Sequence, residues 1–173
     1  MQFSHTTRSR FTAEQLFRTY RDHLVEIAPL IGSVQRVERR SRSTLADGSV
    51  ELVHLWYGTA EAVPVFIRPF VQVEMLRWLD YTRWEAHSLT ASWRIELPAL
   101  GEAVRAAGTY RFEADGDGGR VVAVGDLSLN TAGLPPAMVS AKPLVEKMVV
   151  GLLEPMVEDA GGAVVRWLES REG

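Results

Sequence analysis

The chain has 173 residues, of which 46% are hydrophobic and 24% are charged, a composition typical of a globular protein with a sizeable core. Its formal net charge of −3 argues against a general nucleic-acid-binding protein, because such proteins normally carry a large basic excess. The chain has no cysteine, which excludes disulfides and thiolate metal sites and suits a reducing compartment. The first ten residues lack the apolar run of a signal peptide, and no stretch is apolar for long enough to cross a bilayer. We therefore expect a cytoplasmic protein without integral membrane association.

The N-terminal segment predicts a strand followed by a helix. Residues 2–10 alternate with period two, and this alternation places Phe3 and His5 on one side of a strand. Thr12 and Gln15 then form the signature of a capping box, in which each side chain satisfies a backbone N–H of the first helical turn. The apolar residues behind them follow helical spacing: Leu16, Tyr20, Leu24, Ile27 and Ile31.

The next segments predict a hairpin and a region that is harder to interpret. Residues 33–45 are polar and rich in arginine, residues 50–57 are apolar, and the Asp47-Gly48 pair between them is a strong hairpin signal. Two prolines bracket residues 60–71, so this part is either an edge strand or a loop laid over the sheet. Residues 72–80 are predicted to form a strand of uncertain phase, and residues 80–83 a turn.

Three further segments alternate clearly between apolar and polar residues. They are residues 89–97, 104–113 and 121–129, and the glycine-rich run at 115–119 predicts a hairpin between the last two. An antiparallel sheet usually has one solvent-exposed face and one buried face.

The last part of the chain predicts a long buried helix. After Leu134-Pro-Pro, apolar residues recur at four-residue steps from Leu144 to Leu168, and the residues beside this stripe are apolar too. Gly151 and Pro155 predict a bend in this helix. Either a ligand approaches the backbone there, or a bulky strand residue such as Trp93 packs into the gap.

The order of elements predicts one α+β domain over residues 1–173. An antiparallel sheet of about seven strands curls around the C-terminal helix, with a short helix after the first strand. A sheet curled around a helix leaves space where the two surfaces diverge, and large side chains or a ligand must fill that space.

Several segments occur in an order that resembles a known superfamily. They are the Thr12-capped helix, Trp93-Arg-Ile-Glu-Leu97, Gly108-Thr-Tyr-Arg-Phe112, Arg120-Val-Val-Ala-Val-Gly-Asp126 and the helix that starts at Pro143-Leu-Val-Glu-Lys. Together they resemble the START and birch-pollen-allergen-like helix-grip superfamily (SRPBCC), in particular its bacterial branches. The resemblance implies a groove between sheet and long helix that carries lipids, sterols or aromatic molecules. A minority of the superfamily cyclise or dehydrate polyketides.

The histidines offer weak catalytic candidates and no metal site. None of the four histidines has a second ligand at metal-binding spacing, so no metal is expected. His54 and His5 lie beside apolar residues; both are more readily explained as core histidines, and they are the first acid–base candidates if the chain is an enzyme. No phosphate-cradling loop or dinucleotide fingerprint is present, so no cofactor is expected.

Large apolar residues on the predicted inner surfaces are candidates for lining a cavity. Tryptophan offers a large area with one polar handle, and methionine adapts to different apolar guests. Arg68 or Arg77 could anchor a polar head group if its side chain points inward. The predicted ligand-binding residues are Trp56, Phe66, Arg68, Met75, Arg77, Trp78, Trp93, Tyr110, Met148, Leu152 and Met156.

These patterns leave three functional hypotheses. The first is a non-enzymatic carrier or sensor of a hydrophobic or amphipathic small molecule. The alternative is an enzyme of the polyketide cyclase or dehydratase type that uses the same cavity. The third is a protein-association domain, in which a patch of Val65, Phe66, Ile67 and Phe70 forms an interface such as that of a homodimer. The basic run from Arg36 to Arg42 is either a solvated sheet face or a surface that attracts anions.

Overall fold

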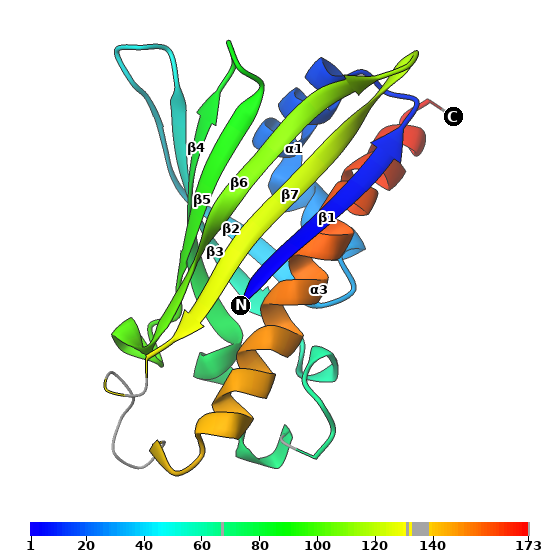
Figure 1. Cartoon of the computed structure of the whole chain (residues 1–173). Helices are drawn as coiled ribbons and strands as arrows, with labels where there is room; N and C mark the ends of the chain where they lie inside the picture. The colour runs from blue at the N-terminus through cyan, green and yellow to red at the C-terminus, as the bar shows by residue number, and fades with distance from the viewer. Residues whose placement is uncertain (67, 131, 133–138, 173) are drawn as a thin grey trace.

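The computed structural model describes residues 1–66, 68–130, 132 and 139–172, and it shows a curved antiparallel sheet that wraps around helices on its concave side (Figure 1). The seven strands are arranged in the order β1-β7-β6-β5-β4-β3-β2. The strands are β1 (Gln2–Ser9), β2 (Val34–Thr44), β3 (Val50–Gly58), β4 (Arg77–Glu85), β5 (Thr90–Glu96), β6 (Val104–Asp115) and β7 (Gly118–Leu129). The helices are α1 (Ala13–Ile27) and α3 (Lys142–Glu169), with short 3-10 turns η1 (Ala28–Leu30), η2 (Ala60–Ala62), η3 (Arg68–Phe70), η4 (Val73–Leu76) and η5 (Gly101–Ala103).

Helix α1 begins at the predicted capping box. The Thr12 side chain accepts a hydrogen bond from the Gln15 N–H at 3.2 Å, and the Gln15 side chain accepts one from the Thr12 N–H at 2.9 Å. The helix ends at Ile27, and η1 follows directly and carries the chain through Pro29. Its apolar stripe is buried against the concave side, as the helical spacing predicted.

Both predicted hairpins are confirmed. In the β2–β3 turn, Gly48 has a φ of +81°, and the Asp47 side chain accepts a hydrogen bond from the Ser49 N–H at 2.9 Å. In the β6–β7 turn, Gly116 has a φ of +60°, and Asp115 pairs with Gly118. Glycine adopts such a positive φ without the steric strain of other residues, which explains why these turns occur there.

The predicted boundaries of the strand and the turn in residues 72–83 are wrong. Val73–Leu76 forms a 3-10 turn instead of a strand, and Asp80 to Arg83 lie inside β4 instead of in a turn. In β4 the buried positions are Trp78, Asp80, Thr82 and Trp84. Two polar residues on the buried face hid the period of two, and pairing with both β3 and β5 holds this segment as a strand. Residues 60–71 form the predicted loop, with Ile67 outside the described residues.

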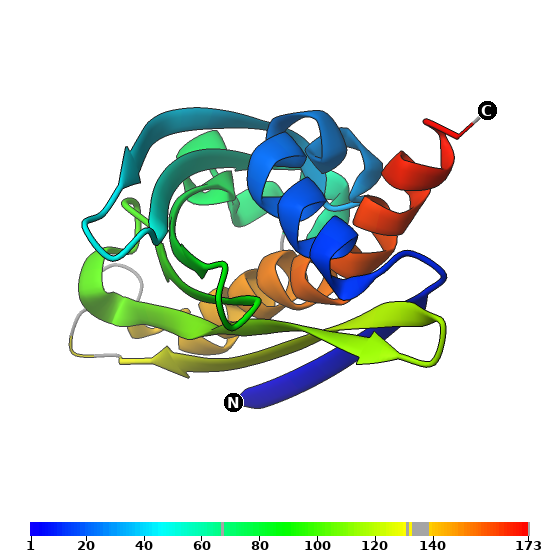
Figure 2. The ribbon, with the colours of Figure 1, turned by 90° about the horizontal axis from the view of Figure 1, so that it is seen from above.

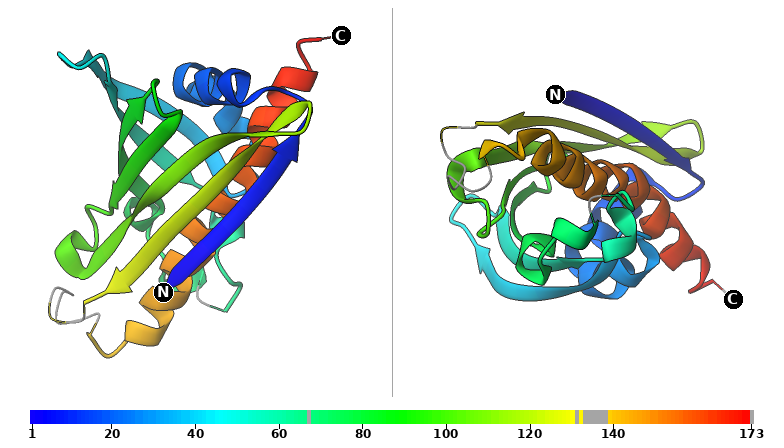
Figure 3. Two further views of the ribbon diagram at one scale, coloured as in Figure 1. Left: turned by 45° about the horizontal axis from the view of Figure 1, so that its top comes forward. Right: turned by 90° about the horizontal axis from the view of Figure 1, so that it is seen from below.

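Helix α3 runs through Gly151 and Pro155 and is enclosed by the curled sheet, as Figure 2 and Figure 3 show. The Leu134-Pro-Pro segment, which the sequence placed before this helix, lies outside the described residues. At Gly151 the helix packs against the loop before β4, because a Cβ atom there would lie 3.1 Å from the Ala62 carbonyl oxygen. The packing explanation therefore holds at Gly151, although the partner is this loop and not Trp93. No helix in the described part of the chain is both long and apolar enough to cross a membrane.

Candidate functional site

Two ionisable residues lie buried and opposite each other on the concave face. His54 of β3 pairs with Asp80 of β4, and their exposed fractions are 2% and 7%. Arg39 of β2 pairs with His54 on its other side, and Ile95 of β5 pairs with Asp80. The alternation of the strands therefore brings a base and an acid together on the side that faces the helices.

The Asp80 carboxyl is the more unusual of the two groups. Burial raises its pKa to about 7, because a low-dielectric interior disfavours the carboxylate. The neighbouring Trp56 indole lowers the pKa of Asp80 and so offsets part of this rise. The geometry of the Trp56 N–H nevertheless meets the criteria for a hydrogen bond with no acceptor in the described residues. No cation is among the groups that shift this pKa. Near neutral pH, Asp80 therefore exists in comparable amounts as an acid and as a carboxylate.

The His54 imidazole is held in its neutral form. Burial, and next the positive charge of Arg39, lower its pKa to about 4. Its Nδ1 atom is buried without a hydrogen-bond partner among the described residues. His54 is therefore a weak base at neutral pH but remains able to donate or accept a hydrogen bond.

Three tryptophans bury their N–H groups without an acceptor in the described part of the structure. They are Trp56, Trp78 and Trp93, all on the concave side. Leaving a buried donor unsatisfied costs about 1–3 kcal/mol. Trp56 and Trp78 stack with ring centroids 5.8 Å apart. The interior thus contains several donors that the described protein groups do not satisfy.

Aromatic rings form the wall around this polar cluster. Tyr110 and Tyr20 lie with ring centroids 5.1 Å apart, and both are buried. Burial raises the pKa of Tyr110 above its ordinary value, and the charge of Asp80 adds to the rise, so the two side chains lie within electrostatic reach. Trp93 and Tyr110 lie 6.1 Å apart.

Helix α3 and the turn before β4 contribute the flexible apolar side chains. The predicted residues Met75, Met148, Leu152 and Met156 are all buried. Gly58 at the end of β3 allows close packing here, because a Cβ atom there would lie 3.0 Å from both Leu152 Cδ2 and Trp78 Cζ3.

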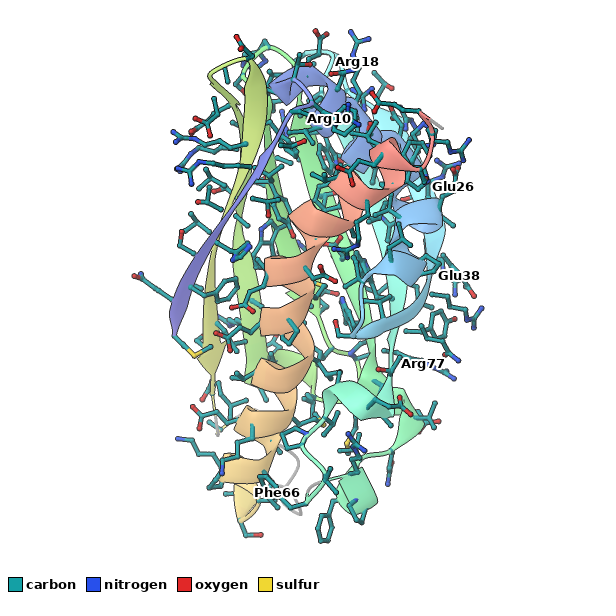
Figure 4. All side chains as sticks on the ribbon, turned by 90° about the vertical axis from the view of Figure 1, so that its right-hand side faces the viewer. Arg10, Arg18, Glu26, Glu38, Phe66 and Arg77 are labelled. Carbon is teal, nitrogen blue, oxygen red and sulfur yellow. The ribbon has the colours of Figure 1, made fainter. Side chains whose placement is uncertain are left out.

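Three predicted ligand-binding residues lie away from this interior. Phe66 is 58% exposed and lies at the end of the molecule where α3 begins (Figure 4). Arg68 donates hydrogen bonds to the carbonyl oxygens of Val63 and Glu61, both at 2.8 Å, and so braces its own loop. Arg77 is exposed and lies over the Tyr57 ring at 5.3 Å. These contacts give neither arginine the inward orientation that an anchor for a head group requires.

The two candidate histidines are not brought together. His5 lies on β1, at one edge of the sheet, and lines a shallow hollow between β1 and α3. His54 lies on β3, next to the opposite edge strand. Sequence reasoning missed Asp80 as a site residue, although its alternation with Trp78 and Trp84 places it on their face.

The hollows of the described structure lie mainly at its surface. One hollow, of about 750 Å³, is on the convex face of β5–β7, where the small residue Ala107 lies between Arg94 and Asp126. A hollow of about 150 Å³ lies between the end of β7 and the first half of α3, next to Leu127 and Val149.

No model of a known protein family matches the chain. No curated protein matches it either.

Solved structures match the chain over nearly its whole length. The ZhuI aromatase/cyclase from Streptomyces sp. R1128 aligns with a TM-score of 0.71 and 13% identity, covering 100% of this chain and 96% of that one. The protein TTHA0849 from Thermus thermophilus aligns with a TM-score of 0.65 and 20% identity, covering 96% and 99%. A norcoclaurine synthase point mutant from Thalictrum flavum aligns with a TM-score of 0.60 and 12% identity, covering 100% and 96%. The chain therefore has the helix-grip fold that these structures share.

Proposed function

We propose that the chain binds an amphipathic small molecule between the concave face of the sheet and α3. The polar part of this molecule faces Asp80, and its apolar part lies among Trp93, Tyr110 and Met156. The observation that carries the proposal is the set of buried polar groups without partners among the described residues: the N–H groups of Trp56, Trp78 and Trp93 and the Nδ1 of His54.

The free-energy loss from these unsatisfied groups favours an interior that binds a ligand over one that only stabilises the fold. Each unsatisfied donor destabilises the fold by about 1–3 kcal/mol, and an apolar side chain of similar shape would remove that loss. The buried Asp80 carboxyl, with no cation among the groups that shift its pKa, adds a further destabilisation. A ligand with hydrogen-bonding groups supplies the missing partners. Polar groups that weaken a fold are expected where they serve function.

The surrounding apolar side chains suit an adaptable site. Met148 and Met156 on α3 and Met75 in η4 have flexible side chains that repack around different guests. A molecule that enters between β7 and α3 would displace such side chains more easily than branched ones.

Native mass spectrometry of protein purified from its host tests the proposal, and an Asp80→Leu variant sharpens it. We expect a co-purifying small molecule on the wild-type protein. Asp80→Leu should raise the melting temperature and lose this molecule, because it removes a buried ionisable group and the ligand's partner together. Asp126→Asn, with 60% of the native side chain exposed on the convex face, is the matched control and should change neither. Wild-type protein without any bound mass, or an Asp80→Leu variant that retains it, would contradict the proposal.

A second candidate function is acid–base catalysis on a bound carbonyl compound, of the polyketide cyclase or dehydratase type. The pKa of about 7 for Asp80 favours it, because a general acid or base works best when its pKa lies near the operating pH. Asp80 replaces the histidines as the acid–base candidate, since a pKa of about 4 makes His54 a weak base at that pH and leaves it without the extra proton of an imidazolium acid.

Exchange of the α-protons of acetophenone in heavy water, followed by NMR, tests this second function. We expect the protein to accelerate exchange, with a pH dependence centred near 7, and Asp80→Asn to abolish the acceleration. His54→Gln should reduce the rate less, because a neutral imidazole positions the ketone without taking its proton. An unaccelerated rate in the wild-type protein, or full activity in Asp80→Asn, would leave binding as the function.

A further inference from the structure

The two edges of the sheet differ in their protection against pairing with a further strand. At one edge, the ladder of β2 with β3 has two register shifts, and β2 contains four arginines: Arg36, Arg39, Arg40 and Arg42. Bulges and charged side chains are common means of keeping an edge strand from adding another strand. At the other edge, β1 pairs with β7 over its whole length without a register shift, and it contains no proline. The protective features are therefore concentrated at the β2 edge.

The ladder of β1 with β7 determines which backbone groups lie at the free edge of β1, the side opposite β7. Met1 and Leu127 exchange both hydrogen bonds, one of them from the Leu127 N–H to the Met1 carbonyl oxygen at 2.7 Å. Pairs of this kind alternate along an antiparallel ladder. Every second residue of β1 therefore directs its N–H and C=O toward the free edge: Gln2, Ser4, Thr6 and Arg8. Among the described strands, none lies beyond β1.

The side chains of these four residues leave no unbalanced charge at the free edge. Gln2, Ser4 and Thr6 are uncharged and exposed. Arg8 forms an ion pair with Asp115 at 2.9 Å, so its charge already has a partner. An exposed edge strand without a bulge, a proline or an unbalanced charge favours the addition of a strand from another chain.

A hollow of about 590 Å³ lies beside this edge, between β1 and α3. Thr6 and Arg8 line it from the strand, and Pro155 and Glu158 line it from the helix. The helix lies next to β1 in Figure 1, and the two elements come closest where Gly161 faces Thr7. An extended segment that pairs with β1 would therefore lie over the exposed side of α3.

Glu158 gives this hollow a negative charge that the protein does not balance. Its exposed carboxylate forms no ion pair with another described residue. The neighbouring Asp159 differs, because it pairs with Arg166 at 2.9 Å. A basic side chain on an added segment would thus meet an available carboxylate at Glu158, whereas an acidic one would be repelled.

We propose that the free edge of β1 is a docking site for an extended segment of a partner protein that carries a basic residue. The main chain of this segment bonds to the N–H and C=O groups of Ser4 and Thr6, and its basic side chain pairs with Glu158. In strand addition of this kind, main-chain hydrogen bonds supply affinity and side-chain contacts supply selectivity. The site lies outside the interior of the proposed function, so either can fail without the other.

Two peptides test the docking site: acetyl-Thr-Val-Lys-Val-Thr-amide and the same peptide with Glu in place of Lys. Their dissociation constants are measured by NMR titration of the full chain at low salt. We expect the Lys peptide to bind at least about 5-fold more tightly, and Glu158→Lys to reverse this preference. Glu102→Lys is the matched control and should leave the preference unchanged, because Glu102 is also exposed without an ion pair among the described residues but lies in η5.

Hydrogen exchange of the backbone amides distinguishes strand addition from other modes of binding. The amides of Ser4 and Thr6 lack a ladder partner and should exchange rapidly in the free protein, unlike those of His5 and Thr7. A saturating amount of the Lys peptide should slow exchange at Ser4 and Thr6 at least about 5-fold and leave His5 and Thr7 unchanged. Thr6→Pro removes one N–H at the free edge without removing a bond to β7, so it should weaken peptide binding.

Three results would overturn the proposal. They are binding of neither peptide, an unchanged preference in Glu158→Lys, and unchanged exchange at Ser4 and Thr6 with peptide bound. Slow exchange at these two amides in the peptide-free protein, increasing with protein concentration, would also overturn it and identify a second copy of the chain as the occupant. Thermal unfolding of each variant checks the fold, and Glu158→Lys decides the question if Thr6→Pro does not fold.

Discussion

Burial moves the pKa values of Asp80 and His54 in opposite directions, although the two residues share one ladder position. The pKa of the carboxyl rises from 3.8 to about 7, and the pKa of the imidazole falls from 6.5 to about 4. Both groups are therefore neutral in the folded protein between about pH 4 and pH 6.5, where both are charged in the unfolded chain. Each of them makes folding less favourable in this range, but with opposite dependence on pH.

The sign for each residue follows from proton uptake. For Asp80 the folded state binds more protons, so stability is lost as pH rises from about 4 to 7, by about 1.4 kcal/mol per pH unit. For His54 the unfolded state binds more protons, so stability is lost as pH falls from about 6.5 to 4. The two tyrosines near Asp80, Tyr20 and Tyr110, stay protonated over this range, because burial raises their pKa values.

We predict that Asp80→Asn gains stability over the wild-type protein as pH rises from about 4.5 to about 6.5. His54→Gln should show the opposite trend and gain most at the acid end. Urea unfolding at several pH values gives both differences, with Asp126→Asn as a control at an exposed carboxyl. If the free energy of unfolding of both variants changes with pH in the same way as that of the wild-type protein, neither group is buried as described.

At the scale of elements, the sequence predicted those features whose interacting residues lie close together in the chain. The capping box of Thr12 and Gln15 and the turn at Gly48 involve residues no more than three apart, and both were predictable. Strand β4 was mispredicted because its residues are held by partners in β3 and β5. The close crossing of α3 and β1 at Gly161 and Thr7 could not be predicted either, since 154 positions separate Gly161 from Thr7.

This crossing leads to opposite predictions for two adjacent glycines. At Gly161 a Cβ atom would lie 2.5 Å from Thr7 Oγ1, whereas at Gly162 it would first meet the flexible end of Arg166 at 3.0 Å. Gly161→Ala should destabilise the protein by about 1–3 kcal/mol through overpacking. Gly162→Ala should be neutral or stabilise it by up to about 1 kcal/mol through helix propensity. Thermal unfolding of both variants checks this. Thr7→Gly should rescue Gly161→Ala, because it removes both Oγ1 at 2.5 Å and Cβ at 2.8 Å, but should not rescue Gly162→Ala. Equal effects at the two sites would contradict the crossing.

At the scale of the whole molecule, one end exposes large apolar side chains. Val65, Phe66, Phe70 and Val73 are 58% to 71% exposed, and Lys147 of α3 lies 5.1 Å from the centre of the Phe66 ring. Arg68 donates hydrogen bonds to the carbonyl oxygens of Val63 and Glu61 and so constrains the backbone next to these side chains. Exposed apolar clusters of this kind often mark interaction surfaces.

We predict that the chain self-associates through this apolar end. Sedimentation velocity over a range of concentrations should show a dimer that Phe66→Ser with Phe70→Ser weakens at least about 10-fold, the loss of about 1.4 kcal/mol of apolar burial. Val25→Ser with Leu30→Ser is the control, because these residues are also exposed, at 43% and 40%, on another part of the molecule. A monomer at every concentration, or equal effects of the two pairs, would exclude this end as the interface.

The sequence by itself determined the class of fold, the two hairpins, the Thr12 cap and the burial of α3, because apolar periodicity and turn chemistry are local. It also placed Trp56, Trp78 and Trp93 among the inner residues. Only the tertiary structure decided that Asp80 lies opposite His54, that α3 crosses β1 at Gly161 and Thr7, and that Phe66 and Arg77 lie outside. The physical reason is that strand register sets which side chains meet, and register depends on pairing between segments far apart in the chain.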